Sequence, residues 1–280
     1  MASGVMARNE ENIPHSALYT AATWKWAQMP CAEFTTPDGA DKLFSVVNAY
    51  MKFYRFINPK KYSLHHTLLH RHAMINYLLE RAGCGQIIEI AAGFSPRGAY
   101  NSENTDTRYY EVDLEDVVNL KRNQLQKTPE GKSVIARQNF QQIACDILKL
   151  DFSETFPPER SFVITEGLMM YFSREEQLKV WKRIADFIRA NGGEYVFDYI
   201  PLDIEPDRSA VGRMLHFFKE CLGGDGQGYC YDQRGKWDVR DDLLAAGFES
   251  VDVLESSVQA RQWNLPHHDV ATHVIVYHCR

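Results

Sequence analysis

Short apolar segments alternate with helical stretches through the middle of this chain, and most of them run directly into a glycine-containing turn or an acidic residue. The first five segments cover residues 86–90, 108–112, 140–145, 161–165 and 194–200. Strands that alternate with helices in this way predict a mostly parallel sheet covered by helices on both faces. Two further apolar segments lie near the end of the chain, so we expect a seven-stranded α/β domain whose last strands are residues 251–257 and 272–279.

Helical patterns fill the stretches around these strands. They cover residues 16–28, 41–58, 64–82, 114–125, 173–190 and 238–246. Ser173 and Glu176 form an S-x-x-E capping box at the start of the fifth helix. We divide the chain into an N-terminal helical lid segment, residues 1–60, and a main domain, residues 61–280. Residues 201–236 break the alternation, and we expect them to form a cap over the ligand end of the sheet.

Composition excludes several classes of protein. The chain has 280 residues, with 31 Lys and Arg against 37 Asp and Glu, and its formal net charge of −6 argues against binding nucleic acid through its phosphates. No apolar stretch is long enough to span a membrane, and the first residues lack the apolar core of a secretory signal. The six cysteines contain no C-x-x-C pair. We expect a cytoplasmic protein with reduced thiols and without a nucleic-acid or membrane partner.

Histidines do not form a convincing metal site in this sequence. His267, His268 and Asp269 stand together beside a proline, without a further ligand at a suitable spacing, so we expect a solvated turn and no metal. Four more histidines spread around the helix expected at residues 64–82. We interpret all four as surface and packing residues: His65, His66, His70 and His72.

The residues that follow the first four strands indicate an adenosine-containing ligand. Ligands of open α/β sheets bind outside the carboxyl ends of the strands, where this sequence has Gly93, Asp113, Asp146 and Glu166. A carboxylate after the second strand can accept hydrogen bonds from both ribose hydroxyls, and one after the third can accept from the adenine amino group. The turn lacks the motifs of a P-loop and of a dinucleotide site, and Pro96 removes an N–H that a pyrophosphate would use. S-adenosylmethionine, which has no pyrophosphate, is therefore the leading candidate.

Arg71 lies on the apolar stripe of the helix expected at residues 64–82, between Leu68 and Ile75. A guanidinium at such a position requires an anionic partner. Two partners fit equally well. One is the methionyl carboxylate of the cofactor, and the other is an acid of the protein in a buried structural ion pair.

Four motifs stand in order at the expected strand ends. They are E-I-A-A-G-F-S-P-R-G at residues 89–98, Y-Y-E-V-D-L at 109–114 with Lys121 following, C-D-I-L at 145–148 and I-T-E-G-L-M-M-Y-F-S at 164–173. Together they resemble the leucine carboxyl methyltransferase family, in particular its bacterial branch of polyketide O-methyltransferases typified by the tetracenomycin enzyme. The resemblance implies a Rossmann-like class I methyltransferase fold with a helical lid, and S-adenosylmethionine as the cofactor. Ser95 stands where many relatives have an acid, while the turn itself follows the polyketide branch.

The resemblance also implies roles for individual residues. Arg71 would bind the methionyl carboxylate, Gly93 would let the backbone approach the cofactor, and Asp113 would hold the ribose hydroxyls. Ile147 and the acid before it would bracket the adenine, and the acid after the fourth strand would meet the methionyl amine. The full set of candidate cofactor-binding residues is Arg71, Glu89, Gly93, Arg97, Asp113, Leu114, Asp146, Ile147, Glu166 and Gly167. Arg97 could equally pair with an acid of the protein.

The acceptor pocket is expected where the N-terminal segment and the insertion meet above the transferred methyl group. Its candidate residues are large and apolar or aromatic: Tyr19, Trp24, Met170, Tyr171, Met214, Phe217 and Phe218. A carboxylate acceptor is already ionised at neutral pH, whereas a phenol with a pKa near 10 usually needs a general base. Candidates for such a base are Tyr171, His15 and His216, and Tyr171 could equally pack in the core.

These observations predict an S-adenosylmethionine-dependent O-methyltransferase. Its acceptor would be the carboxylate or phenol of a small molecule, aromatic or polyketide-like. Two alternatives stay open: a methyltransferase for the C-terminal carboxylate of a protein, and a cofactor-binding regulator without turnover. The complete set of strand-end residues argues against the regulator.

Overall fold

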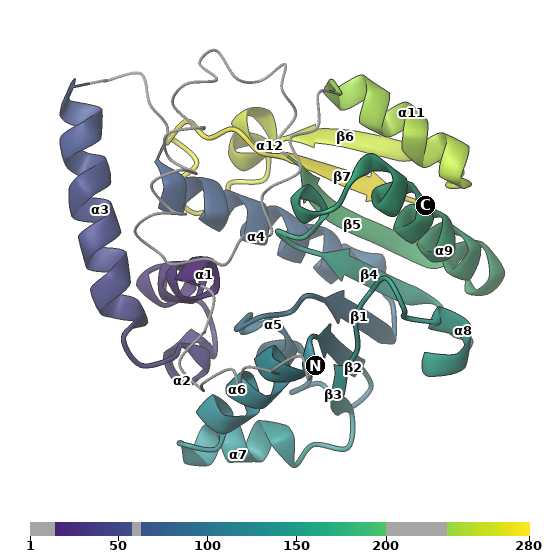
Figure 1. The fold of residues 1–280 in the computed structure, drawn as a ribbon, viewed down its shortest axis with the longest axis horizontal. Coiled ribbons are helices and arrows are strands. Elements are labelled where there is room, and N and C mark those ends of the chain that lie inside the picture. Colours follow the sequence, from purple (N-terminus) through teal and green to yellow (C-terminus); the bar gives the residue numbers. More distant parts are fainter. Residues whose placement is uncertain (1–14, 58–62, 200–233) are drawn as a thin grey trace, which may run out of the picture.

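A seven-stranded sheet forms the centre of the computed structural model, which describes residues 15–57, 63–199 and 234–280 (Figure 1). The strand order is β3-β2-β1-β4-β5-β7-β6. Strands β1 to β5 pair in parallel, and β7 runs antiparallel to both of its neighbours. The strands are β1 (Gln86–Ile90), β2 (Arg108–Asp113), β3 (Phe140–Ala144), β4 (Ser161–Thr165), β5 (Gly193–Tyr199), β6 (Val251–Glu255) and β7 (Ile275–Cys279). This is the expected mostly parallel sheet with a terminal antiparallel pair.

Helices cover both faces of the sheet, and each face has its own apolar core. One face packs on α4 (Leu64–Ala82), α5 (Arg97–Asn101), α7 (Pro129–Ile135) and α12 (Ser256–Gln262). The other face packs on α8 (Phe152–Thr155), α9 (Arg174–Asn191) and α11 (Lys236–Ala246). Helix α6 (Glu115–Leu125) lies against β2 and β3, and the short 3₁₀ helix η1 (Met169–Tyr171) follows β4.

Three N-terminal helices lie beside the sheet. They are α1 (His15–Trp26), α2 (Ala32–Thr35) and α3 (Ala40–Ile57). Helix α2 lies against α6, and α3 lies on the outer side of α1 (Figure 1). Helix α1 contacts α2, α3 and α4. Helix α4 packs on α1 and α12 as well as on strands of the sheet, and every residue from Leu69 to Ile75 is buried. Arg71 lies within this buried run.

The long elements agree with the sequence predictions. Strands β1 and β4 have the predicted bounds, and helix α4 spans residues 64–82 as expected. The predicted capping box of α9 is present, with Ser173 as N-cap and Glu176 at the third helical position. The Trp181 side chain on the apolar stripe of α9 is fully buried. The prediction of a strand over residues 251–257 was wrong at its end, because β6 stops at Glu255 and Ser256 begins α12, where its hydroxyl accepts from the Val274 backbone.

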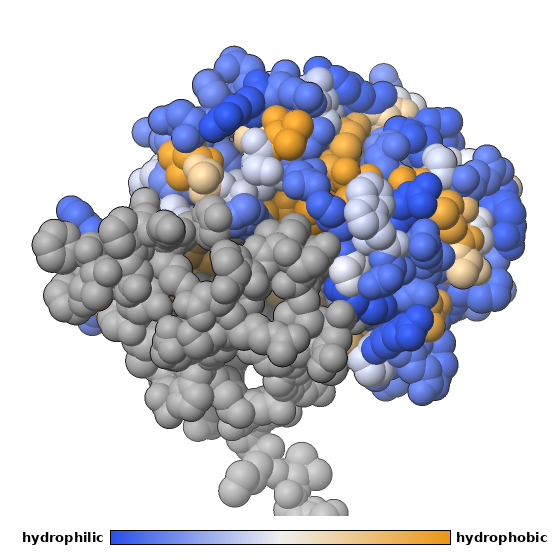
Figure 2. All heavy atoms as spheres, turned by 90° about the horizontal axis from the view of Figure 1, so that it is seen from above, coloured by the Kyte–Doolittle hydropathy of each residue, from blue (hydrophilic) through white to orange (hydrophobic). Residues whose placement is uncertain are grey.

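Hydrophilic side chains cover most of the described surface on the face seen from above, with apolar side chains in small separate patches (Figure 2). Within the described ranges, no helix combines the length and the apolar character that crossing a bilayer requires. The insertion expected to form a cap lies almost entirely outside the described residues, as does the connection between α3 and α4.

Candidate functional site

The turn after β1 brings backbone to the carboxyl edge of the sheet. Ala91 and Gly93 both adopt left-handed backbone angles, with φ of 55° and 49°. The Gly93 N–H donates to Oδ2 of Asp113 at 2.8 Å, which fixes the turn on the end of β2. A Cβ built on Gly93 would meet no atom within 4 Å. The turn therefore presents glycine backbone to open space, where a ligand can approach closely.

Asp113 and Leu114 form the next part of the edge. Oδ1 of Asp113 accepts from the Leu114 N–H at 2.8 Å, so both carboxylate oxygens bond to backbone and the side chain is held in one orientation. Burial raises the pKa of Asp113, although the N–H groups of Gly93 and Leu114 act in the opposite direction. Leu114 directly follows this oriented carboxylate and is 56% exposed, which is unusual for a leucine beside a buried strand.

After β3, as after β2, an aspartate side chain accepts from a backbone N–H group, but here only one such bond forms. Oδ1 of Asp146 accepts from the Leu148 N–H at 2.9 Å, and Ile147 between them is buried in the core of the sheet. Strand β3 is the neighbour of β2, so Asp146 and Ile147 lie next to the edge that Asp113 and Leu114 form.

Glu166, directly after β4, is held by three basic side chains. Oε1 accepts from Nε of Arg71 at 3.0 Å, and Oε2 accepts from Nη2 of Arg97 at 2.7 Å. Nδ1 of His72 lies 2.9 Å from the same Oε2 and donates when it carries the proton. Burial opposes ionisation, but His72, Arg97 and Arg71 outweigh it and hold the pKa of Glu166 well below its usual range. Glu166 is therefore a rigid buried carboxylate.

Arg71 bridges the ends of β4 and β5. In addition to its bond with Glu166, Arg71 donates from Nη1 to Oδ2 of Asp198 at 3.3 Å. The other oxygen of Asp198, Oδ1, accepts from the Gly167 N–H at 2.5 Å. Gly167 has φ of 69°, and a Cβ there would lie 3.1 Å from Nη1 of Arg71. Of the two partners that the sequence allows for Arg71, the structure contains the acids of the protein.

Arg97 is enclosed completely, with no exposed side-chain surface. It pairs with Glu89 through Nη1, and its Nε donates to Oδ1 of Asn76 at 2.6 Å. The remaining oxygen of Glu89 accepts from the Tyr109 hydroxyl at 2.6 Å. Arg97 therefore links α5 to β1, α4 and the end of β4.

A second buried ion pair supports the turn from below. Nζ of Lys121 on α6 donates to Oε1 of Glu111 at 2.6 Å and to the Ser95 carbonyl at 2.7 Å. Ser95 is in the turn after β1, so this lysine ties the turn to β2. Gly98 completes the packing, because a Cβ there would lie 2.3 Å from Oε1 of Glu111.

The structure describes four of the candidates for the acceptor pocket, and they lie in three different places. Trp24 lies at the site: it is 5% exposed, its ring centroid is 4.9 Å from that of His72, and it shares an apolar cluster with Phe94 of the turn. Tyr19 lies instead between α1 and α3, where its hydroxyl donates to Oδ1 of Asn48 at 3.0 Å and burial raises its pKa. Met170 and Tyr171 are half-buried in η1, directly after the Glu166 region.

Five further candidates have no described side chain. One is His15, which begins α1. The other four lie outside the described residues: Met214, His216, Phe217 and Phe218.

Sequence reasoning missed two members of the charged cluster. His72 was interpreted as a packing residue, and it contacts both Glu166 and Arg97. Asp198 was not singled out, although it stands near the carboxyl end of β5 as the other acids stand at the ends of their strands. Applying the strand-end rule to the fifth strand would have found Asp198. No sequence signal separates His72 from the other histidines of α4.

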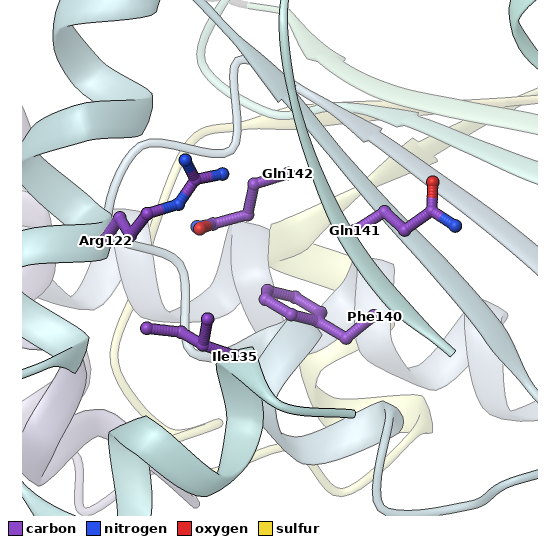
Figure 3. Close-up of a pocket in the computed structure, with 5 residues that line it drawn as sticks. All are labelled: Arg122, Ile135, Phe140, Gln141 and Gln142. Carbon is purple, nitrogen blue, oxygen red and sulfur yellow. The ribbon is translucent and has the colours of Figure 1, made fainter. Parts of the chain in front are cut away.

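A pocket of about 260 Å³ lies elsewhere, between α6, α7 and the edge strand β3. In Figure 3, Arg122 and Gln142 reach toward each other, whereas Gln141 points to the other side of the strand. Phe140 at the bottom of this pocket is the first residue of β3, so the pocket lies toward the end of the strand opposite Asp146. We do not place the cofactor there.

Histidine and acidic side chains in the described part of the chain include no group of three or more that could hold a metal. The His267, His268 and Asp269 segment is exposed there. His267 stacks on Trp26 with ring centroids 5.3 Å apart, and Nδ1 of His268 lies 3.1 Å from the Leu265 carbonyl.

Residues 53–185 match the family model of leucine carboxyl methyltransferase, and this match confirms the resemblance drawn from the motifs. It covers α4, the turn after β1 and the ends of β1 to β4. Comparison with curated protein sequences found no match.

Solved structures support the class I methyltransferase fold. A DUF574 family protein from Streptomyces avermitilis superposes with a TM-score of 0.58 at 13% identity, covering 95% of this chain and 97% of that one. The S-adenosylmethionine-dependent methyltransferase SibL gives a TM-score of 0.52 at 13% identity, covering 95% and 69%. A third structure, PigF with SAH, has a TM-score of 0.47 at 14% identity over 74% of this chain, and this chain spans only 55% of its length. At 13% identity, the likeness to the first two structures shows the fold alone.

Proposed function

We propose that this chain, whose residues 53–185 carry the leucine carboxyl methyltransferase pattern on a class I methyltransferase fold, transfers a methyl group from S-adenosylmethionine to an oxygen of a small acceptor. The observation that carries the proposal is the row of groups at the carboxyl edge of β1 to β4. Open glycine backbone, an oriented carboxylate with an exposed leucine, and a buried ionised glutamate follow one another there as Gly93, Asp113 with Leu114, and Glu166.

Each of these groups matches one part of the cofactor. Asp113, held by two backbone N–H groups, would accept from the ribose hydroxyls, and the exposed Leu114 would offer an apolar surface to the adenine ring, with Asp146 and Ile147 beside it. Glu166, an acid with a strongly lowered pKa, would accept from the ammonium group. These residues therefore fit the cofactor from its adenine to its methionyl end.

The charge of the cluster at the methionyl end supports the same ligand. Three buried carboxylates, on Glu89, Glu166 and Asp198, face the two guanidinium groups of Arg71 and Arg97. Burial and the nearby Arg97 lower the pKa of His72, while Glu166 acts in the opposite direction. The three carboxylates and two guanidinium groups, counted without His72, have a net charge of −1. S-adenosylmethionine, with an ammonium, a sulfonium and a carboxylate, has the opposite net charge and would balance it.

Bound there, the cofactor would supply an activated methyl group, and the protein would contribute alignment and exclusion of water. The acceptor oxygen gives its electron pair to the methyl carbon while the carbon–sulfur bond breaks, which leaves S-adenosylhomocysteine. Trp24 on α1, together with Met170 and Tyr171, would border the acceptor side. We propose that the N-terminal helices act as the lid over this side.

A carboxylate is the favoured acceptor because it is already ionised at pH 7 and needs no base. The test uses radiolabelled S-adenosylmethionine, labelled in the methyl group, with a panel of aromatic carboxylic acids and phenols. Methyl esters release volatile methanol in alkali, whereas methyl ethers do not. We expect base-labile label with the acids, and S-adenosylhomocysteine formed in equal amount.

The Asp113→Ala variant serves as the control for cofactor-dependent turnover. If only phenols took up label, and that label were stable to base, the acceptor would be a phenol and not a carboxylate. Label transferred only to a protein's C-terminal carboxylate would favour the protein methyltransferase alternative. Binding of cofactor without turnover of any acceptor in the panel would contradict the proposal for small molecules.

A further inference from the structure

The pocket between α6, α7 and β3 has no part in the proposed function. Its volume of about 260 Å³ suits a compact small molecule. Phe140 and Gln142 line it, and so does Gln141, although the Gln141 side chain points to the other side of β3 (Figure 3). Because residues from both faces of the strand contribute, the pocket follows the outer edge of β3.

Arg122 brings a positive charge into this pocket. Its side chain is half-buried, and its guanidinium has no hydrogen bond or ion pair with any residue that the structure describes. The other half-buried arginines of the described ranges each have an acceptor: Arg137 donates to the Ala99 carbonyl, Arg183 to the Leu150 carbonyl and Arg240 to Asp241. A partly desolvated guanidinium without an acceptor favours the binding of an anion.

The backbone of β3 offers a second donor at the same edge. The Asn139 carbonyl accepts from the Tyr109 N–H at 2.8 Å, and the Cys145 N–H donates to the Asp113 carbonyl at 2.9 Å. Because alternate residues of a strand bond to the same neighbour, the odd-numbered residues from 139 to 145 bond to β2. The N–H of Gln142 therefore points outward, along the side where β3 ends the described sheet.

The Gln142 side chain is held in place by the ion pair behind it. Its Nε2 donates to Oε2 of Glu111 at 3.1 Å, and Nζ of Lys121 donates to the other oxygen of Glu111 at 2.6 Å. The buried acid nearest to the pocket thus already has a cation of its own. This arrangement fixes one wall of the pocket and leaves the charge of Arg122 to a ligand.

The remaining wall determines the kind of anion. Ile135 and Phe140, which is only 5% exposed, give the pocket an apolar side. A planar carboxylate matches the fork of a guanidinium, and an apolar body would fill the space against these two side chains. A bare phosphate would use the charge but would leave the apolar side without a partner.

We propose that this pocket binds a small organic carboxylate with a compact apolar body, whose carboxylate meets Arg122 and the outward N–H of Gln142. The site is separate from the cofactor edge, because the pocket lies toward the end of β3 opposite Asp146. It shares no residue with the proposed cofactor or acceptor positions. The inference therefore stands or falls independently of the proposed function.

The test measures binding of para-fluorobenzoate to the full-length protein by fluorine NMR titration, with the neutral para-fluorobenzamide as the matched ligand. We expect saturable binding of the acid by the wild-type protein. The amide should bind the wild-type protein at least about tenfold more weakly, and Arg122→Gln should weaken binding of the acid by a similar factor, since hydrogen bonds to a charged group are lost. Arg261→Gln, at an exposed arginine of α12, is the control and should leave the affinity unchanged.

Ile135→Trp tests the pocket itself, because it fills the space and keeps Arg122. It should also weaken binding of the acid, and circular dichroism shows whether each variant is folded. Equal affinity of the wild-type protein and Arg122→Gln would overturn the inference, since the acid would then bind elsewhere, for example on the proposed acceptor side. Equal affinity of the wild-type protein and folded Ile135→Trp would also overturn it, because the arginine would then attract acids by charge alone. Absence of saturable binding by the wild-type protein would do the same, and none of these results bears on methyl transfer.

Discussion

Glu89 and Glu111 are neighbours in register on β1 and β2, so their buried carboxylates would repel each other without nearby cations. Arg97 pairs with the first and Lys121 with the second. Each cation also contacts one part of the proposed binding edge, since Arg97 donates to Glu166 and Lys121 donates to the Ser95 carbonyl. At the residue scale, the buried ion pairs therefore serve to position the turn and Glu166. Their net contribution to stability is secondary, because desolvation offsets most of the attraction in such pairs.

Removing one member of this cluster should destabilise the fold. Arg71→Met leaves Glu166 and Asp198 without a shared partner, and we expect the free energy of unfolding to fall by about 3–5 kcal/mol, as measured by urea denaturation. Glu166 keeps its ion pair with Arg97, so the charge left uncompensated is that of Asp198, and adding Asp198→Asn removes it. The double variant should then be more stable than Arg71→Met alone. A double variant that is less stable than the single one would contradict this account of Arg71.

The raised pKa of Asp113 predicts how cofactor affinity depends on pH. Burial makes this carboxyl take up a proton at a higher pH than an ordinary aspartate, and a protonated group is a poorer acceptor for ribose hydroxyls. Affinity for S-adenosylhomocysteine should therefore fall as the pH is lowered from 7 toward about 5. Asp113→Asn, which cannot ionise, should bind more weakly at pH 7 and lose little further affinity on acidification. Calorimetry at constant ionic strength measures both, and an identical pH dependence in the two proteins would rule out Asp113 as the titrating group.

At the scale of elements, the sequence predicts the long helices and the strands, whose apolar residues form recognisable patterns, and it misses the short helices. Long helices such as α4 and α9 show helical periodicity of apolar residues, and β1 and β4 stand out as apolar runs bounded by turn residues. Helices α2, α5, α7, α8 and α12 are too short to show a period, since each has between 4 and 7 residues.

Some residues of the candidate site were predictable from the sequence and others were not. Its strand-end acids were predictable because parallel strands bring their carboxyl ends to one edge. The partners of Arg71 were not, because Glu166 and Asp198 lie 95 and 127 residues away in the chain. The place of His72 depends on which face of α4 meets α5 and α1, and four histidines on one helix give no means of choosing among them.

Helix α5 should depend on the absence of a side chain at Gly98. A Cβ there would lie 2.3 Å from Oε1 of Glu111 and 2.9 Å from Cε2 of Phe140, so Gly98→Ala must push α5 away from the sheet. We expect a loss of about 1–3 kcal/mol in unfolding free energy. Gly85→Ala is the control, since its Cβ would approach nothing closer than 3.8 Å. Chemical denaturation should show a change at Gly98 only, and equal losses in both variants would contradict the packing argument.

At the scale of the whole molecule, three features coincide at one edge of the sheet. The strand-end groups face outward there, the buried ion pairs fix them, and α1 packs beside them through Trp24. The pocket beside β3 lies away from this edge and has none of these features. Ligand binding at the edge would link α1, α4, α5 and the ends of β1 to β4. A ligand that binds only the folded protein should therefore raise its thermal midpoint.

The most direct measurement of this account is calorimetric titration of S-adenosylhomocysteine into the wild-type protein and into Asp113→Ala. The account predicts one binding site in the wild-type protein and an affinity at least about tenfold lower in the variant, because charge-assisted hydrogen bonds to the ribose are lost. The unliganded variant should also show a lower thermal midpoint, because the N–H groups of Gly93 and Leu114 lose their acceptor, but it should still unfold cooperatively. Wild-type protein that binds NAD instead, or the same S-adenosylhomocysteine affinity in both proteins, would contradict the placement of the cofactor at the strand ends.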